Sequence, residues 1–248
     1  MEFNSADNYF SPSSSSVPVS VPVSPQDATE IIQRIQSQIS RVFIGQEHVV
    51  EQILCALLAG GHVLLEGVPG LGKTLLAKAL AQACTCHSSR IQFTPDLMPA
   101  DVTGHMFYDM KASEFVVRRG PVFTNLMLAD EINRAPAKTQ AALLEVMQEG
   151  QVTIEGETSQ LTPPFLVIAT QNPIEQDGTY ALPEAQLDRF LLHVIFDYPS
   201  EAEERELVSA STFERVGDRL EVDKIEPVAS PEVIVALQKI TAGIQVDD

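Results

Sequence analysis

A glycine-rich loop set between a strand and a helix constrains the fold more than any other feature. Residues 67–74 read GVPGLGKT and fit the pattern G-x-x-x-x-G-K-[ST] at every fixed position. The apolar run 62–66 predicts a buried strand, and residues 75–83 are rich in strong helix formers. In such a unit, backbone N–H groups of the loop and the helix N-terminus converge on phosphate oxygens. The loop is therefore expected to bind a nucleotide.

Two side chains of this loop have specific roles in the pattern. Lys73 would reach the β and γ phosphates, and the Thr74 hydroxyl would hold Mg²⁺. The alternative, a glycine-rich turn ahead of an ordinary helix, is disfavoured because the flanking strand and helix are both present. We expect ATP and Mg²⁺ as ligands, with these nucleotide contacts: Gly67, Val68, Pro69, Gly70, Leu71, Gly72, Lys73, Thr74 and Leu75.

The composition limits which binding partners and which cellular compartment we expect for the chain. Asp and Glu number 34 against 16 Lys and Arg, a net charge of −18, which makes nucleic acid an unlikely general partner. Neither a run of 18 apolar residues nor a secretory leader is found in the sequence. Sparse cysteines (Cys55, Cys84 and Cys86) favour reduced thiols in the cytoplasm, and the spacing in residues 84–87 is not that of a zinc site.

Strands alternate with helices along the chain, which predicts an α/β fold: a parallel sheet with helices on both faces. The expected strands are 62–66, 90–94, 126–129, 165–170 and 191–196, and the expected helices are 28–42, 47–59, 75–83 and 138–148. Two hairpin-like inserts are expected as well. One joins 114–117 to 122–123 through a turn at 118–121, and the other joins 152–154 to 159–161.

Three regions follow from the composition. Residues 1–26 are rich in Ser and Pro and are expected to form a disordered tail. Residues 27–199 form the ATP-binding α/β core. Residues 200–248 are acidic and helical, with helices expected at about 201–211 and 232–240, and they form a partial lid.

An acidic pair follows the apolar strand 126–129. Asp130 at that position can hold the Mg²⁺ shell, and Glu131 can orient and deprotonate the attacking water. Charge beside an apolar strand is costly unless it has a partner such as Mg²⁺. A strand followed by Asp-Glu is a weak signal alone, but it becomes a strong one after a phosphate loop.

Two further polar residues are candidates for the site. Asn172 follows the strand 165–170 and could contact the γ-phosphate or the water, although Asn-Pro is also a common turn initiator. Arg189 precedes the last strand. It could pair with Asp188 alone, or it could project into the nucleotide site of a neighbouring subunit and stabilise the transferring phosphoryl group.

In this order the motifs resemble the MoxR family of AAA+ ATPases over roughly residues 27–240. The segments that carry the resemblance are IGQ at 44–46, GVPGLGKT at 67–74, FTPDL at 93–97, LADEINRA at 128–135, QEGQV at 148–152, ATQNP at 169–173 and LPEAQLDRF at 182–190.

The resemblance implies Walker A at 67–74, Walker B at Asp130-Glu131, sensor 1 at Asn172 and an arginine finger at Arg189. It also implies that Gly45 and Gln46 lie near the adenine and that the two hairpins are the helix-2 and pre-sensor-1 inserts of this clade. Family members are hexameric rings with chaperone-like roles. They often act with von Willebrand factor A domain proteins and help to mature metalloenzymes.

The sequence departs from the family pattern in its lid. No recognisable sensor-2 arginine is present, since Arg205, Arg215 and Arg219 lack that context. A truncated lid leaves a nucleotide-gated binding scaffold with little turnover as an alternative to an ATPase that remodels a client. A DNA-acting motor has only Arg118-Arg119 in its favour, and the net charge argues against it.

Overall fold

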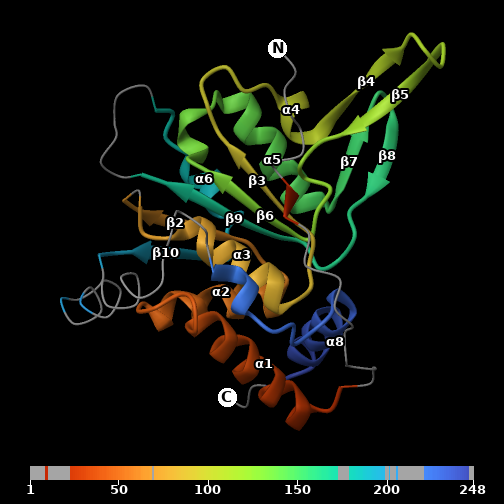
Figure 1. The fold of residues 1–248 in the computed structure, drawn as a ribbon. Helices are drawn as coiled ribbons and strands as arrows, with labels where there is room; N and C mark the ends of the chain where they lie inside the picture. The colour runs from red at the N-terminus through yellow and green to blue at the C-terminus, as the bar shows by residue number, and fades with distance from the viewer. Residues whose placement is uncertain are drawn as a thin grey trace.

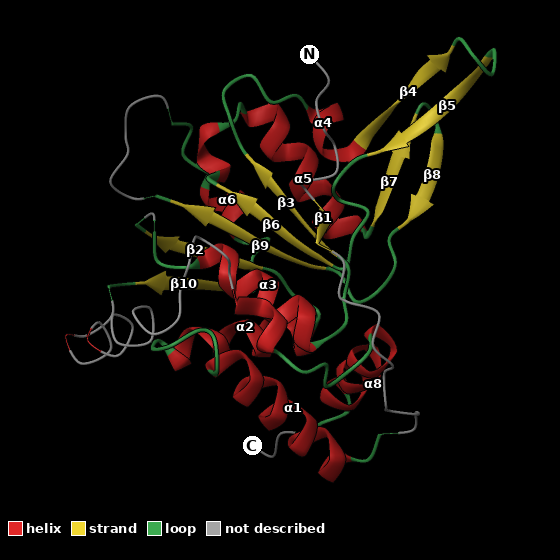
Figure 2. Cartoon of the chain, viewed as in Figure 1, coloured by secondary structure: helices red, strands yellow, loops and turns green. Residues whose placement is uncertain are grey.

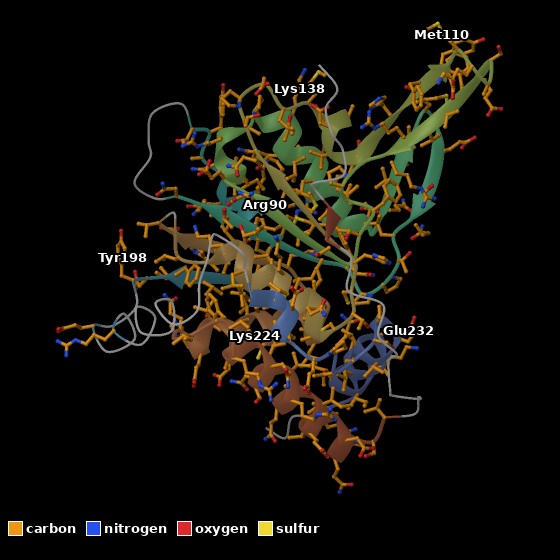
Figure 3. The ribbon with its side chains drawn as sticks, viewed as in Figure 1. Arg90, Met110, Lys138, Tyr198, Lys224 and Glu232 are labelled. Atoms are coloured by element: carbon orange, nitrogen blue, oxygen red, sulfur yellow. The ribbon has the colours of Figure 1, made fainter. Side chains whose placement is uncertain are left out.

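The computed structural model of the chain describes residues 9–10, 23–68, 70–172, 179–198, 201, 205 and 221–245. Pro69 of the phosphate loop, most of the helix expected at about 201–211, and most of the predicted tail lie outside the described residues. The described part of the chain is drawn by position in Figure 1 and by secondary structure in Figure 2.

A twisted six-stranded sheet forms the centre of the described fold (Figure 1). Its strand order is β1-β3-β6-β9-β2-β10, and all neighbours are parallel except β1 and β3. The parallel sheet predicted by the alternation of elements is thus confirmed. The strands are β1 (Tyr9–Phe10), β2 (Val63–Gly67), β3 (Ser88–Gln92), β6 (Leu126–Asp130), β9 (Leu166–Gln171) and β10 (Leu192–Phe196).

Helices cover both faces of the sheet, and each face has its own core (Figure 2). One face carries α1 (Pro25–Ser40), α2 (Glu47–Ala59), α3 (Lys73–Ala83) and α8 (Pro231–Ala242), while the other carries α4 (Pro99–Thr103) and α5 (Ala137–Glu149). Alternate residues of β2 enter different cores: Val63 and Leu65 face α3, whereas Leu64 faces the α5 side. A strand buried on both faces needs such a continuous apolar run.

The N-terminal part of the described chain differs from the sequence expectation at two places. Tyr9–Phe10, inside the predicted disordered tail, forms β1 and extends the sheet beyond β3. Helix α1 begins at Pro25, because the Ser24 side chain accepts the Asp27 N–H while the Asp27 carboxylate accepts the Ser24 N–H. Pro25 suits the first helical position, where its missing donor costs nothing.

The first hairpin is present, but its strands differ from those predicted. It pairs β4 (Gly104–Asp109) with β5 (Glu114–Arg119), so the turn lies at 110–113 and not at 118–121. The Asp109 carboxylate accepts the N–H groups of Lys111 and Ala112 at that turn. Gly120 lies instead at the base of the hairpin, where a Cβ would approach the Val102 carbonyl oxygen to 2.3 Å. The prediction mistook this close backbone approach for a turn.

Several shorter elements complete the fold. The second hairpin joins β7 (Gln151–Ile154) to β8 (Glu157–Gln160), close to the predicted limits. Short helical turns that the sequence did not predict are η1 (Ile132–Arg134), α6 (Glu184–Leu187) and η2 (Glu221–Lys224), in addition to α4. Within the described residues, no helix has both the length and the apolar character needed to cross a membrane.

Candidate nucleotide-binding site

A cavity of about 450 Å³ lies where the phosphate loop meets the carboxyl ends of the central strands. Residues that the sequence singled out from three separate segments line it: the phosphate loop, the Asp130-Glu131 pair and Asn172. Two further lining residues, Arg90 and Gln92, belong to β3 and were not predicted. Ligands of parallel α/β sheets bind at such a strand edge.

Two glycines of the loop have a backbone conformation that suits a phosphate cradle. Gly70 and Gly72 have φ angles of 90° and 87°, in the left-handed region that favours glycine. Gly72 is the N-cap of α3, so the free N–H groups of that helix point toward the cavity end of the loop. A Cβ on Gly72 would come within 3.3 Å of the Phe43 ring, which packs behind the loop.

Lys73 is held against the loop that precedes it. Its Nζ donates to the Gly67 carbonyl oxygen over 2.6 Å. Burial lowers the pKa of this ammonium group, while the negative charges of Asp130 and Glu131 oppose that shift. A partly desolvated cation near two carboxylates is well placed to interact strongly with an incoming polyphosphate.

Asp130 is fixed by a neighbouring strand on each side. The Thr170 hydroxyl of β9 donates to Oδ1 over 2.7 Å, and the Arg90 guanidinium of β3 donates to Oδ2 over 2.7 Å. The side chain of Asp130 is only 17% exposed, whereas that of Arg90 is 39% exposed. Both oxygens of the carboxylate are therefore oriented by the sheet itself.

Glu131 has two donors of its own. Its Oε2 accepts from Gln92 Nε2 over 2.7 Å and from Arg134 Nε over 2.9 Å. Its backbone is left-handed, with φ of 55°, and its N–H donates to the Thr170 hydroxyl over 2.9 Å. A non-glycine residue in this conformation is held there by its surroundings, and such residues cluster at functional sites.

The ends of β9 and β2 are linked beside the cavity. Asn172 is buried and lines the cavity directly after β9. The preceding Gln171 donates to the Glu66 carboxylate over 2.7 Å, and the same carboxylate lies 2.9 Å from Nε2 of His193 on β10. These contacts tie the strand before the phosphate loop to both of its neighbours.

Five of the predicted site residues that the structure describes lie outside the cavity lining: Gly45, Gln46, Val68, Leu71 and Arg189. Gly45 and Gln46 precede α2, and the Gln46 side chain donates to the Asp197 carbonyl oxygen at the end of β10. Arg189 is exposed in the turn before β10, and among the described residues it forms no ion pair with Asp188. The structure therefore does not show the salt bridge to Asp188 that was the alternative role for Arg189.

Sequence reasoning missed four residues that hold the acidic pair: Arg90, Gln92, Arg134 and Thr170. A usable signal existed for two of them. Arg90 and Gln92 are polar residues two apart in a short strand, so they share one face. Strand pairing then sets Gln92 opposite Asp130.

The cavity suits a magnesium ion in its donor chemistry. Thr74 supplies a hydroxyl oxygen and Asp130 a carboxylate oxygen, and both line the space that faces the phosphate loop. Mg²⁺ prefers such hard oxygen ligands, and it usually retains waters and nucleotide oxygens beside one or two protein ligands. No group of three or more His, Cys, Asp or Glu side chains that could bind a metal ion on its own is found among the described residues, so a magnesium ion here would depend on nucleotide oxygens and water as well.

Comparison with known proteins defines the class. Residues 62–192 match the family model described as the ATPase family associated with various cellular activities (AAA). A crystal structure of a protein from Cytophaga hutchinsonii that is assigned as an ATPase superposes with a TM-score of 0.79 at 40% identity, covering 90% of this chain and 67% of that one. The fold is thus that of an AAA+ ATPase, and the α/β fold class expected from the sequence is confirmed.

Two curated relatives narrow the class further. The chaperone MoxR1 of Mycobacterium tuberculosis is 54% identical over 177 residues, which is 71% of this chain and 47% of the relative. YeaC of Bacillus subtilis, an uncharacterised protein, is 47% identical over 223 residues, or 90% of this chain and 68% of the relative. The chain therefore belongs to the MoxR family of AAA+ ATPases, and it spans about half the length of MoxR1.

Proposed function

We propose that the chain binds Mg²⁺·ATP in the cavity and hydrolyses it, with Glu131 as the general base. The observation that carries this proposal is the convergence of the phosphate loop, the Asp130-Glu131 pair and Asn172 on one cavity. These residues come from three separate parts of the sequence. Phosphoryl transfer needs such positioning and charge stabilisation more than covalent chemistry from the protein.

Each residue has a distinct task. The loop N–H groups and Lys73 bind the β and γ phosphates, while Thr74 and Asp130 would hold Mg²⁺. When bound, Mg²⁺ neutralises charge that develops on the phosphate oxygens. Asn172 orients the γ-phosphate or the attacking water. Glu131 accepts a proton from that water, and its Oε1 is the better placed oxygen, because Gln92 and Arg134 both donate to Oε2.

Arg189 is proposed to act on the site of a neighbouring subunit. It is exposed and lies away from its own cavity lining, which a residue acting between subunits requires. An arginine supplied in this way stabilises charge on the transferring phosphoryl group. This role implies a closed ring, which we take to be a hexamer. Gly45 and Gln46 are proposed to border the adenine, because the adjacent Phe43 packs against the phosphate loop.

Ring motions driven by hydrolysis are proposed to remodel a client protein in the cytoplasm. The chaperone name of MoxR1 supports a chaperone-like role. A von Willebrand factor A domain protein or a metalloenzyme is the expected partner. In this scheme residues 27–199 supply the ATPase core, and residues 200–248 contribute to a helical lid.

The test is phosphate release from ATP in the presence of Mg²⁺ by the parent chain and by Glu131→Gln. The variant should keep ATP affinity and lose turnover by two orders of magnitude or more, since general-base catalysis contributes about 10²–10⁴-fold. Glu149→Gln, at the exposed end of α5, is the matched control and should keep full turnover.

Turnover that survives in Glu131→Gln would refute the assignment of the base. ATP binding and assembly without phosphate release by the parent chain would instead establish the nucleotide-gated scaffold.

A further inference from the structure

The Arg90 guanidinium contacts the carboxylate of Asp130, which is the group proposed to bind the metal. Its Nη2 lies 2.7 Å from Asp130 Oδ2 and 3.1 Å from Gln92 Oε1. It also lines the cavity that the phosphate loop faces. The pair spans two adjacent strands whose register is fixed, so it is a built feature of the sheet rather than a contact between mobile surface side chains.

Asp130 needs a cation partner whenever Mg²⁺ does not supply one. Its side chain is 17% exposed, and an unpaired carboxylate at that depth is costly. Arg90 provides the compensating charge, and the Thr170 hydroxyl satisfies the other carboxylate oxygen. Because a guanidinium remains charged at any physiological pH, this compensation does not depend on protonation.

The ion pair between Arg90 and Asp130 also opposes metal binding at Asp130. A guanidinium hydrogen-bonded to Oδ2 occupies a lone-pair direction of that oxygen, and its positive charge repels a second cation at the same carboxylate. Mg²⁺ at Asp130 would therefore compete with Arg90 for the carboxylate, most strongly at Oδ2. Two features favour an alternative position for Arg90: Gln92 Oε1 already accepts from the same nitrogen, and the buried Nε has no hydrogen-bond partner among the described residues.

We propose that Arg90 is an internal counterion of Asp130 that Mg²⁺ displaces, so that Arg90 sets the Mg²⁺ concentration at which the site loads. This inference rests on the proposed function, because it assumes that the metal binds at Asp130. Arg90 touches the carboxylate and not the reacting atoms, so it acts as a positioning residue.

The test is a calorimetric titration of Mg²⁺ into the full chain saturated with ADP, which reads out metal affinity without turnover. Arg90→Met keeps the aliphatic stem and removes the charge. It should tighten Mg²⁺ binding about tenfold, equivalent to about 1.4 kcal/mol. Arg90→Gln, a second neutral variant, should show the same shift. Arg41→Met, which removes a remote arginine at the end of α1, should leave the affinity unchanged.

A double-mutant cycle distinguishes failure of the metal site at Asp130 from failure of the counterion role of Arg90. Asp130→Asn should weaken Mg²⁺ binding, and in that background Arg90→Met should have no further effect. If Asp130→Asn leaves Mg²⁺ affinity unchanged, the metal does not bind at Asp130 and the proposed metal site fails. If Asp130→Asn weakens binding but both neutral variants of Arg90 leave it equal or weaker, the metal site stands and the counterion role is overturned.

Discussion

Thr170 is predicted to be a principal stabilising contact of the acidic pair. Its side chain is fully buried on β9, and its hydroxyl both donates to Asp130 over 2.7 Å and accepts the Glu131 N–H over 2.9 Å. Thr170→Val keeps the shape of the side chain and removes both hydrogen bonds. The substitution therefore tests the polar contacts with little change in packing.

The expected loss of stability in Thr170→Val follows from the two hydrogen bonds of the hydroxyl. A hydrogen bond to a charged acceptor contributes about 1.5–3 kcal/mol, and a buried N–H left without an acceptor costs about 1–3 kcal/mol. Asp130 retains Arg90 as a partner, and the adjoining cavity admits water, so we expect about 3 kcal/mol, toward the lower part of that sum. In a chain of this size that lowers the melting temperature by about 6–12 °C.

The assay is urea unfolding of the parent chain, Thr170→Val and Thr170→Ser under the same conditions. Serine keeps the hydroxyl and loses one buried methyl group, which costs about 1 kcal/mol. Valine should therefore be the more damaging of the two. If Thr170→Val unfolds at the same urea concentration as the parent, or later than Thr170→Ser, the hydroxyl does not hold the acidic pair.

Two further predictions concern stability. His62 is buried, and burial lowers its pKa below the ordinary 6.5. The unfolded chain then binds more protons below pH 6.5, and stability falls as the pH drops from 6.5 through the folded pKa. His62→Gln should flatten this slope between pH 7.5 and 5.5, and parallel slopes would contradict the argument. Gly104→Ala should destabilise more than Gly150→Ala, because both glycines have positive φ but only at Gly104 would a Cβ meet backbone, 2.4 Å from the Arg118 carbonyl oxygen. Thermal unfolding of the two variants measures this, and equal melting temperatures would refute the clash.

Much of the fold could be predicted because its signals are local. The helix expected at 47–59 matches α2, and the apolar runs at 126–129 and 165–170 match β6 and β9 within one residue. Each is long enough, or apolar enough, for its own sequence to determine its structure. The signal of the phosphate loop is local as well, because its glycine pattern lies within residues 67–74.

The features that escaped prediction depend on contacts between distant segments. The position of the first hairpin depends on Gly120 packing against Val102, which no local pattern reveals. Arg90 was read only as part of a strand, because its partner Asp130 lies forty residues further along the chain. The assignments of Asn172 and Arg189 rest on spacing and resemblance, and their roles stay predictions.

The most direct test of the account is a mixing experiment with phosphate release as the readout. Glu131→Gln lacks the base but retains Arg189, whereas Arg189→Ala retains the base but lacks the arginine. If the ring ATPase is correct, each variant alone is inactive, and a mixture recovers turnover wherever an intact Arg189 meets a site with an intact Glu131. A mixture no more active than its separate components would contradict catalysis shared between subunits.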